Sequence, residues 1–259
     1  MTFTAALCLA LGLAQPALRN IHTCAAGHRD VDQFGIHFMN RNCGGSTACT
    51  TNAGNWRQVR HDVVTRTLGR IIQNLGLRVQ FEPRALPGMD ANRRADLQVF
   101  GFPSPTQDAY LDLVIASPYA STLQLKVPPY SEVTAAVRAQ QRKEEAYSRF
   151  VPDGAQFYPV AFDVFGSPAP VASDLLLDIA RRTTERLHGS ECGPAFERSL
   201  RVVTSKLRRQ VSVVIQRENA KCILIGASRS PDAPRSSEHD QSENLLEPRP
   251  LDQILARRP

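Results

Sequence analysis

Residues 94–117 read RADLQVFGFPSPTQDAYLDLVIAS, and this stretch decides the fold class. Two apolar segments rich in Val, Ile, Phe and Tyr, residues 95–102 and 109–117, flank a loop with two prolines, which predicts a β-hairpin. Asp96 lies at the start of the first segment and Asp112 lies within the second. If the strands pair, the two carboxylates approach each other, and oxygen ligands of this kind suit Mg²⁺.

An aspartate within the apolar run LDLVI needs a partner, because burying an unpaired carboxylate is costly. A divalent cation is one such partner. The alternatives are that Asp112 lies on a solvated face of its strand, or that it pairs with Arg93 or Arg94. The pattern of the strand leaves all of these open.

Helices and strands are also predicted on both sides of this hairpin. The apolar residues before it follow the helical period and then alternate as in a strand, and both patterns return after it. We expect helices over residues 55–76, 131–150, 171–188 and 194–217, and further strands over residues 77–82 and 156–165. This order predicts an α/β protein and does not give the order of the strands in the sheet.

The helix over 131–150 carries an unusual face. Ala136, Gln140, Lys143 and Tyr147 recur at spacings of four, three and four, so they share one side of the helix. A helix face with a lysine between a glutamine and a tyrosine is too polar to pack into a hydrophobic core. The face is either solvated, or it presents Lys143 to the two aspartates, where an ammonium can orient a water molecule and stabilise charge on a phosphate.

The N-terminal region is less regular. Residues 5–14, AALCLALGLA, are too few to span a bilayer and form either a signal-peptide core or a short buried helix before Pro16. The absence of Lys and Arg from the first four residues argues against a leader. Residues 20–54 are rich in Cys, His, Asn, Gly and Thr, which is typical of a loop or of a segment organised by a metal.

Composition sets the broader limits. The chain has 259 residues, 42% of them hydrophobic, which suffices for a globular core, and its six cysteines exclude a dense disulfide scaffold. The net charge of +6 mildly favours a polyanionic partner. Residues 181–217 carry nine Lys or Arg and three acidic residues, so they predict either a nucleic-acid surface or an ordinary solvated helix face; Arg181, Arg182, Arg208 and Arg209 are its candidate contacts.

Four stretches, RRAD, LDLVIASP, AQQRKEEAY and FYPVAFDVFG, resemble the PD-(D/E)XK restriction-like endonuclease domain that follows the reverse transcriptase in site-specific non-LTR retrotransposons and their remnants. The resemblance covers about residues 7–228 and implies a restriction-endonuclease-like αβββαβ core with a small mixed sheet. It also assigns roles to individual residues. They are Asp96 and Asp112 as magnesium ligands, and Lys143, Tyr147 and Glu82 as further catalytic residues.

The chain departs from the motifs of that family at three places. Ala95 stands where the family often has proline or glycine, and no lysine follows Asp112 in the usual D-x-K position. In this branch the lysine lies on the helix, which suits Lys143. Ala146 replaces a basic residue that is common before the tyrosine, which affects DNA contacts more than chemistry.

A zinc knuckle precedes the nuclease domain in that family, followed by an R-H-D triplet. His22, Cys24, His37 and Cys43 occur in the order of its ligands, and two histidines with two cysteines form a normal tetrahedral zinc site. His28 and Cys49 are spare ligands, and a metal-free loop is the alternative. The triplet is Arg60-His61-Asp62, from which we expect Arg60 to contact nucleic acid.

These observations predict four segments. They are a short apolar helix over 1–19, a knuckle-like segment over 20–54, a nuclease domain with basic C-terminal helices over 55–226, and a disordered tail over 227–259. The expected function is a nuclear, Mg²⁺-dependent DNA endonuclease from a retrotransposon polyprotein that also meets RNA–DNA integration intermediates and does not bind membranes. The alternatives are an inactive nucleic-acid-binding remnant and a secreted protein with Cys24 bonded to Cys43 or Cys49.

Overall fold

A mixed α/β fold is built around a four-stranded sheet with strand order β1-β2-β3-β4. The structure is a computed structural model, and it describes residues 1–25, 27, 29, 31–39, 56–83, 94–118, 134–189 and 193–233. The first three strands pair antiparallel and β4 pairs parallel with β3. Their bounds are β1 (Val79–Phe81), β2 (Leu97–Phe100), β3 (Asp108–Ala116) and β4 (Gln156–Asp163). All four strands were expected from the sequence, with their ends shifted by a few residues.

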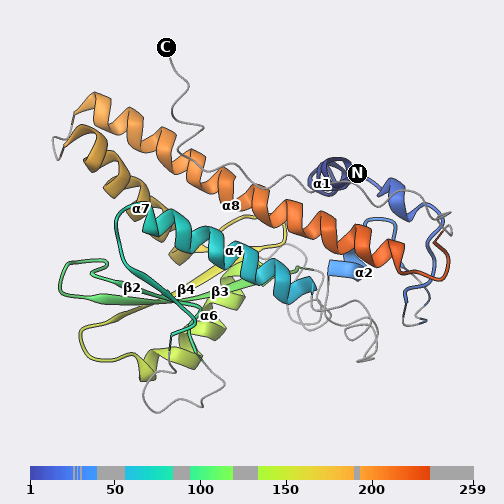
Figure 1. Ribbon diagram of the computed structural model, residues 1–259, viewed down its shortest axis with the longest axis horizontal. Coiled ribbons are helices and arrows are strands. Elements are labelled where there is room, and N and C mark those ends of the chain that lie inside the picture. Colours follow the sequence, from blue (N-terminus) through green and yellow to red (C-terminus); the bar gives the residue numbers. More distant parts are fainter. Residues whose placement is uncertain are drawn as a thin grey trace.

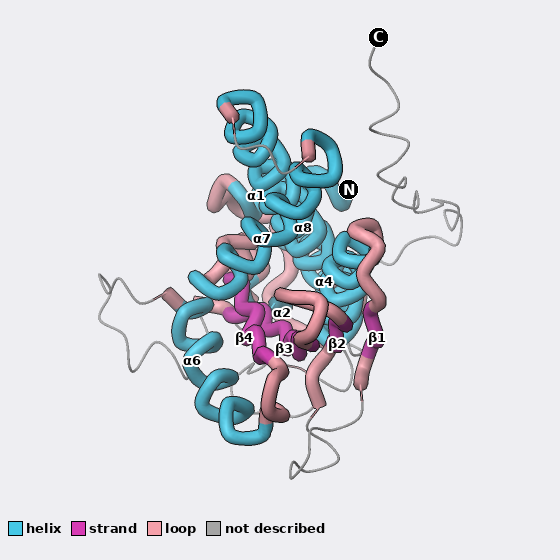
Figure 2. The backbone as a smooth tube through the Cα atoms, turned by 90° about the vertical axis from the view of Figure 1, so that its left-hand side faces the viewer, coloured by secondary structure: helices cyan, strands magenta, loops and turns pink. Residues whose placement is uncertain are grey.

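Helices cover both faces of the sheet (Figures 1 and 2). Their bounds are α4 (Trp56–Gln73), α6 (Ala135–Tyr147), α7 (Pro170–His188) and α8 (Pro194–Ser228). Because side chains alternate along a strand, β3 divides its residues between the two faces. Leu111 and Leu113 join the main core with α4, α7 and α8, whereas Asp112 faces α6. This division places the acidic residue of β3 opposite the lysine-bearing helix.

The main core lies between the sheet and the three helices α4, α7 and α8. Leu68 and Ile72 of α4 and Leu175 and Ile179 of α7 are fully buried there. Ile215 brings α8 into the same cluster. Strand β4 is buried along most of its length, which explains why its sequence reads as a nearly continuous apolar run.

Helix α8 is longer than expected, since it continues to Ser228 rather than ending near residue 217. Its C-terminal half carries the N-terminal segment, which includes α1 (Thr2–Ala10), η1 (Pro16–Leu18) and α2 (Ile36–Met39), as Figure 1 shows. Leu9, Leu18 and Met39 pack with Ile223 and Ala227 of α8. The expected short buried helix is therefore present in α1. None of the helices in the described part of the chain is long and apolar enough to cross a membrane.

The folded part of the chain extends past residue 227, where the predicted tail begins. The Asp232 carboxylate accepts the backbone N–H groups of His22 and Thr23 at 2.9 and 2.7 Å. Ser230 Oγ donates to the carbonyl of Thr23 at 2.6 Å. These bonds fasten the residues after α8 to the N-terminal segment, and the remainder of the predicted tail, residues 234–259, lies outside the described residues.

Candidate active site

Asp96 and Asp112 come close to each other where β2 begins beside β3. Leu97, the first residue of β2, pairs with Leu111, so Asp96 lies immediately before β2 and Asp112 immediately after Leu111 on β3. The Asp96 backbone N–H donates to the carbonyl of Leu111 at 2.9 Å, which holds this residue against β3. The two carboxyl groups lie near enough for the charge of Asp96 to raise the pKa of Asp112. The predicted approach of the two aspartates is confirmed.

Lys143 reaches this pair from α6. Its Nζ donates to Asp112 Oδ2 at 2.6 Å, and the Asp112 side chain is only 4% exposed while that of Lys143 is 31% exposed. Ala136, Gln140 and Tyr147, the other members of the predicted face, are buried. Asp112 is therefore buried and does not lie on a solvated face, and the expected contact with Lys143 is confirmed. Of the two arginines considered as its partner, Arg94 pairs with Glu82, and Arg93 lies outside the described residues.

The two carboxyl groups differ in their protonation. Burial raises the pKa of Asp112 to about 6, helped by the charge of Asp96 and opposed by the ammonium of Lys143. Burial also acts to raise the pKa of Asp96, but the hydrogen bond and positive charge of His61 outweigh it, so this pKa lies below its ordinary value. The pair therefore holds a negative charge that a divalent cation would stabilise.

His61 is the member of the site to which the sequence analysis gave no role. Its Nε2 lies 3.2 Å from Asp96 Oδ2 and 3.1 Å from the carbonyl oxygen of Leu113. Its Nδ1 lies 3.4 Å from Asp62 Oδ1. Burial lowers the pKa of His61, yet these bonds, chiefly with Asp96, raise it to about 9, so the ring is an imidazolium at neutral pH. The R-H-D triplet was the only signal for this residue in the sequence.

Tyr147 lies one turn beyond Lys143 on the same face, as expected. Its hydroxyl donates to the carbonyl of Arg94 at 3.3 Å, and its ring stacks on Phe157 at a centroid distance of 4.8 Å. Lys143 Nζ is 5.7 Å from the centre of the tyrosine ring. The tyrosine thus connects α6 with the backbone just before Asp96.

Glu82 approaches the site with its backbone and not with its carboxylate. Its N–H donates to the carbonyl of Asp96 at 2.8 Å. Its side chain is 64% exposed and accepts a hydrogen bond from Arg94 at 2.5 Å. The structure does not bring this carboxylate to the Asp96–Asp112 pair, so we omit it from the catalytic group.

The predicted zinc ligands are described only in part. His22 is exposed, Cys24 is buried beside Val31 and Phe38, and His37 is half-buried in α2. Cys43 and the spare ligands His28 and Cys49 lie outside the described residues. Within the described ranges, no three His, Cys, Asp or Glu side chains form a group that could hold a metal. Zinc binding stays a prediction.

Two other residues of the knuckle-like segment have structural roles. The Asp32 carboxylate accepts the backbone N–H groups of Phe34, Ile36 and His37, which fixes the turn that leads into α2. Gly35 has a φ of +82°, and a Cβ atom there would lie 2.7 Å from Ile223 of α8. Both residues shape the loop and dock it on α8.

Arg60 corrects one prediction, because its side chain lies in the interior and not on a nucleic-acid surface. The residue is 6% exposed, and its Nη1 donates to Asn219 Oδ1 at 2.6 Å. Asn219 Nδ2 in turn donates to the carbonyl of Val164 at 2.6 Å. Arg60 joins α4 to α8, and we remove it from the predicted DNA contacts.

The other predicted DNA contacts lie on α7 and α8. Arg181, Arg208 and Arg209 are exposed. Arg181 Nη1 lies 3.6 Å from Asp178 Oδ1, and Arg208 Nη2 donates to Ser173 Oγ at 2.6 Å. Arg182 is half-buried instead, with its guanidinium 4.8 Å from the centre of the Phe102 ring. The exposed arginines are available for long-range attraction of phosphate, and Arg182 is held inward.

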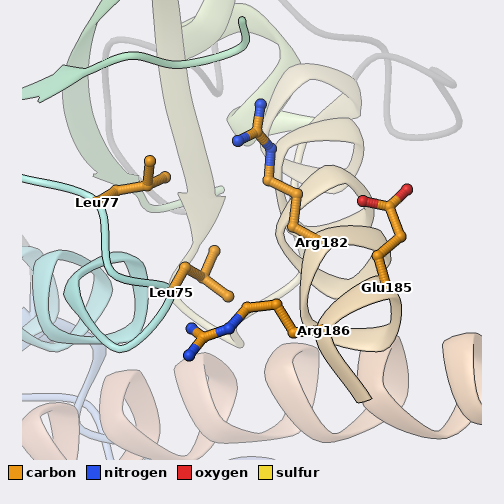
Figure 3. A pocket seen from close by; sticks show the side chains of 5 residues that line it. All are labelled: Leu75, Leu77, Arg182, Glu185 and Arg186. Atoms are coloured by element: carbon orange, nitrogen blue, oxygen red, sulfur yellow. The ribbon is translucent and has the colours of Figure 1, made fainter. Parts of the chain in front are cut away.

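Arg182 also lines a hollow of about 420 Å³ between α7 and the turn after α4, shown in Figure 3 with Leu75, Leu77, Glu185 and Arg186. Arg182 donates to the carbonyl of Pro103, and Arg186 Nη1 donates to that of Asn74 at 2.8 Å. Both guanidinium groups thus hold backbone segments together. The hollow contains none of the residues of the aspartate site.

Two facing carboxylates, an ammonium and an imidazolium therefore meet where β2, β3, α4 and α6 come together. Comparison of the chain with protein-family models gives no match, and comparison with curated proteins gives no significant similarity.

Proposed function

We propose that the chain is a metal-dependent DNA endonuclease in which Asp96 and Asp112 bind Mg²⁺ and Lys143 acts on the attacking water. The observation that carries this proposal is the meeting of the three side chains at one place on the sheet. Asp96 lies just before β2 and close to Asp112 on the neighbouring β3, and Lys143 contacts Asp112 at 2.6 Å.

The aspartate pair fits a hard divalent cation. Two neighbouring carboxyl groups, one with its pKa raised to about 6 by burial and by the charge of the other, form a site that positive charge stabilises. Mg²⁺ usually takes one or two protein carboxylates and keeps several waters, so two aspartates are a sufficient protein contribution. When bound, the ion supplies positive charge beside the phosphate and polarises water.

Lys143 is suited to the remaining task. Its ammonium is fixed by Asp112 and is still 31% exposed, so it can meet a substrate from the solvent side. There it orients the attacking water and stabilises the negative charge that develops on the phosphate oxygens. The ring of Tyr147, which stacks on Phe157, lies 5.7 Å from this ammonium.

The order and direction of the strands support the finer fold proposal, a restriction-endonuclease-like αβββαβ core. The exposed Arg181, Arg208 and Arg209 support a DNA partner, because exposed arginines attract the phosphate backbone without reading sequence. The resemblance of the motifs is the support for three further parts of the proposal. They are an origin in a retrotransposon polyprotein, contact with RNA–DNA integration intermediates and a nuclear location.

Nicking of supercoiled plasmid by the full chain tests the proposal. We expect nicking in Mg²⁺ or Mn²⁺ that EDTA abolishes, and a loss of about a thousandfold, or about 4 kcal/mol, for Asp112→Asn with DNA binding preserved. Glu144→Gln is the matched control, since it removes an exposed carboxylate from α6 beside Lys143. It should retain the wild-type rate.

Two outcomes of this experiment oppose the proposal. Wild-type protein that binds DNA and never nicks it at any concentration of either ion favours the inactive nucleic-acid-binding remnant. Nicking that survives Asp112→Asn shows that the strand cleavage does not arise at this site.

Structural zinc is a separate part of the proposal. We expect one zinc ion per chain, held by His22, Cys24, His37 and Cys43, and its loss in Cys24→Ser. Metal analysis of the purified protein measures this directly. Protein without zinc, with Cys24 disulfide-bonded to Cys43 or Cys49, favours the secreted alternative.

A further inference from the structure

We infer that His61 is a positioning residue, which holds the Asp96 carboxylate so that its Oδ1 atom is presented to the metal ion. This inference rests on the proposed function. It concerns a residue on a different helix from Lys143 and a contact with the other aspartate of the pair.

The contacts of Asp96 carry the inference. Its Oδ2 accepts the backbone N–H of Leu113 at 2.5 Å and lies 3.2 Å from Nε2 of His61. Two donors directed at one oxygen fix the orientation of the carboxylate and occupy that oxygen. Among the described residues both donors lie on Oδ2, so we assign Oδ1 as the Asp96 oxygen that a cation would meet. Asp112 is arranged in the same way, since its Oδ2 accepts from Lys143.

The imidazole is itself held in place. Its Nε2 also lies 3.1 Å from the carbonyl of Leu113, so this side of the ring spans the carboxylate and the backbone of β3. Its Nδ1 faces Asp62 Oδ1 at 3.4 Å, and that oxygen accepts from Gln58 Nε2 at 2.7 Å. With each nitrogen facing an oxygen of the protein, the ring acts as a donor and not as a metal ligand. Such outer partners of metal ligands set ligand orientation and affinity.

A pair of amide substitutions isolates the contact with Asp96. His61→Gln extends a side-chain N–H to about the position of Nε2, whereas the shorter His61→Asn places one near Nδ1, towards Asp62. Gln73→Asn, at an exposed position on the same helix, is the matched control. Mn²⁺ affinity is measured by calorimetry without DNA, and plasmid nicking is measured as a function of Mn²⁺ concentration.

We expect His61→Asn to bind Mn²⁺ about tenfold or more weakly than His61→Gln, because both variants lack the imidazolium charge and only glutamine keeps a donor towards Asp96. The Mn²⁺ concentration for half-maximal nicking should differ between the two variants by a similar factor, and Gln73→Asn should match the wild type. Melting curves check that each variant is folded.

The results separate this inference from the proposed function. Wild-type protein that neither binds Mn²⁺ nor nicks DNA contradicts the proposed function. Wild-type protein that does both, with a folded His61→Asn that binds Mn²⁺ as tightly as His61→Gln, overturns only the role of His61. A folded His61→Gln that has lost tenfold in Mn²⁺ affinity overturns it too, and this comparison remains decisive if His61→Asn fails to fold.

Discussion

The charged groups around Asp96 and Asp112 and those on α7 and α8 differ in how they are held. At the aspartate site, Asp96 lies 3.2 Å from His61 and Asp112 lies 2.6 Å from Lys143, and these side chains are mostly buried. On the helices, Arg181 faces Asp178 at 3.6 Å, and both side chains are well exposed. Charges act strongly on one another where water is excluded, and weakly where water and salt screen them. Substitutions at the aspartate site should therefore alter the rate of DNA cleavage. Substitutions on α7 and α8 should alter the affinity for DNA by small, salt-dependent amounts.

The largest effect in this comparison is expected at Lys143, where Lys143→Met should slow nicking by about a hundredfold or more. The ammonium then no longer acts on the water or the phosphate, while both metal-binding carboxylates remain. Single-turnover rates measure the loss, and Mn²⁺ calorimetry should show affinity at least as high as in the wild type. Arg142→Met removes the exposed cation next to Lys143 on α6 and should change the rate less than about twofold. An unchanged rate in Lys143→Met would make the lysine a structural partner of Asp112.

The next effect concerns stability and pH in the absence of metal. The pKa of His61 rises from 6.5 to about 9 on folding, so its contribution to the free energy of unfolding is full below pH 6.5 and is lost as the pH rises through 9. Between these limits the free energy of unfolding of the wild-type protein should fall by at most about 3 kcal/mol, and that of His61→Gln should not show this fall. Urea unfolding in EDTA at several pH values measures both profiles. The window lies above the titration of Asp112, whose pKa is about 6. Parallel profiles for the two proteins would contradict the pairing of His61 with Asp96.

A smaller effect is expected on the helices. Reversing the charge at Arg208 and Arg209 together should weaken DNA binding about tenfold near 0.1 M salt and flatten its salt dependence. The nicking rate at saturating DNA should stay the same. Arg60→Gln is the contrasting variant, because this buried arginine should affect folding stability and leave the salt slope unchanged. Equal salt slopes for the wild type and the double variant would make Arg208 and Arg209 ordinary solvated surface.

The smallest effect is expected for Tyr147→Phe. The change removes the hydrogen bond to the Arg94 carbonyl and retains the ring that stacks on Phe157. We expect a loss of about 1 kcal/mol in the free energy of unfolding, and a nicking rate within about threefold of the wild type. A hundredfold loss of rate without a change in stability would show that the hydroxyl takes part in the chemistry.

The residues that could be placed from the sequence follow from local periodicity. Asp96 and Asp112 belong to two strands joined by a short loop, so hairpin pairing alone brings them together. Lys143 shares a helix face with Ala136 and Tyr147 by simple spacing, and burial of that face directs the lysine to the sheet. These contacts are made within one helix or between neighbouring elements, so the sequence pattern predicts them directly.

The contacts that the sequence did not reveal depend on how distant elements dock. His61 meets Asp96 and Leu113 only because α4 packs across the sheet, and Arg60 is buried because Asn219 of α8 lies above it. The bonds from Asp232 to the N-terminal segment join residues about 210 positions apart. The Glu82 carboxylate pairs with the exposed Arg94 and not with the aspartates. None of these contacts follows from a helical or strand period.

The most direct test of the central claim is the position of Mn²⁺ in crystals of the full chain, located by its anomalous scattering. We expect one peak between β2 and β3, at about 2.1 Å from one carboxylate oxygen of Asp96 and one of Asp112. On the Asp96 side this oxygen should be Oδ1, with Oδ2 still bonded to Leu113 and His61 as it is here. Crystals soaked at saturating Mn²⁺ that show no peak at this pair, or a peak only elsewhere on the protein, would contradict a metal-dependent active site at Asp96 and Asp112.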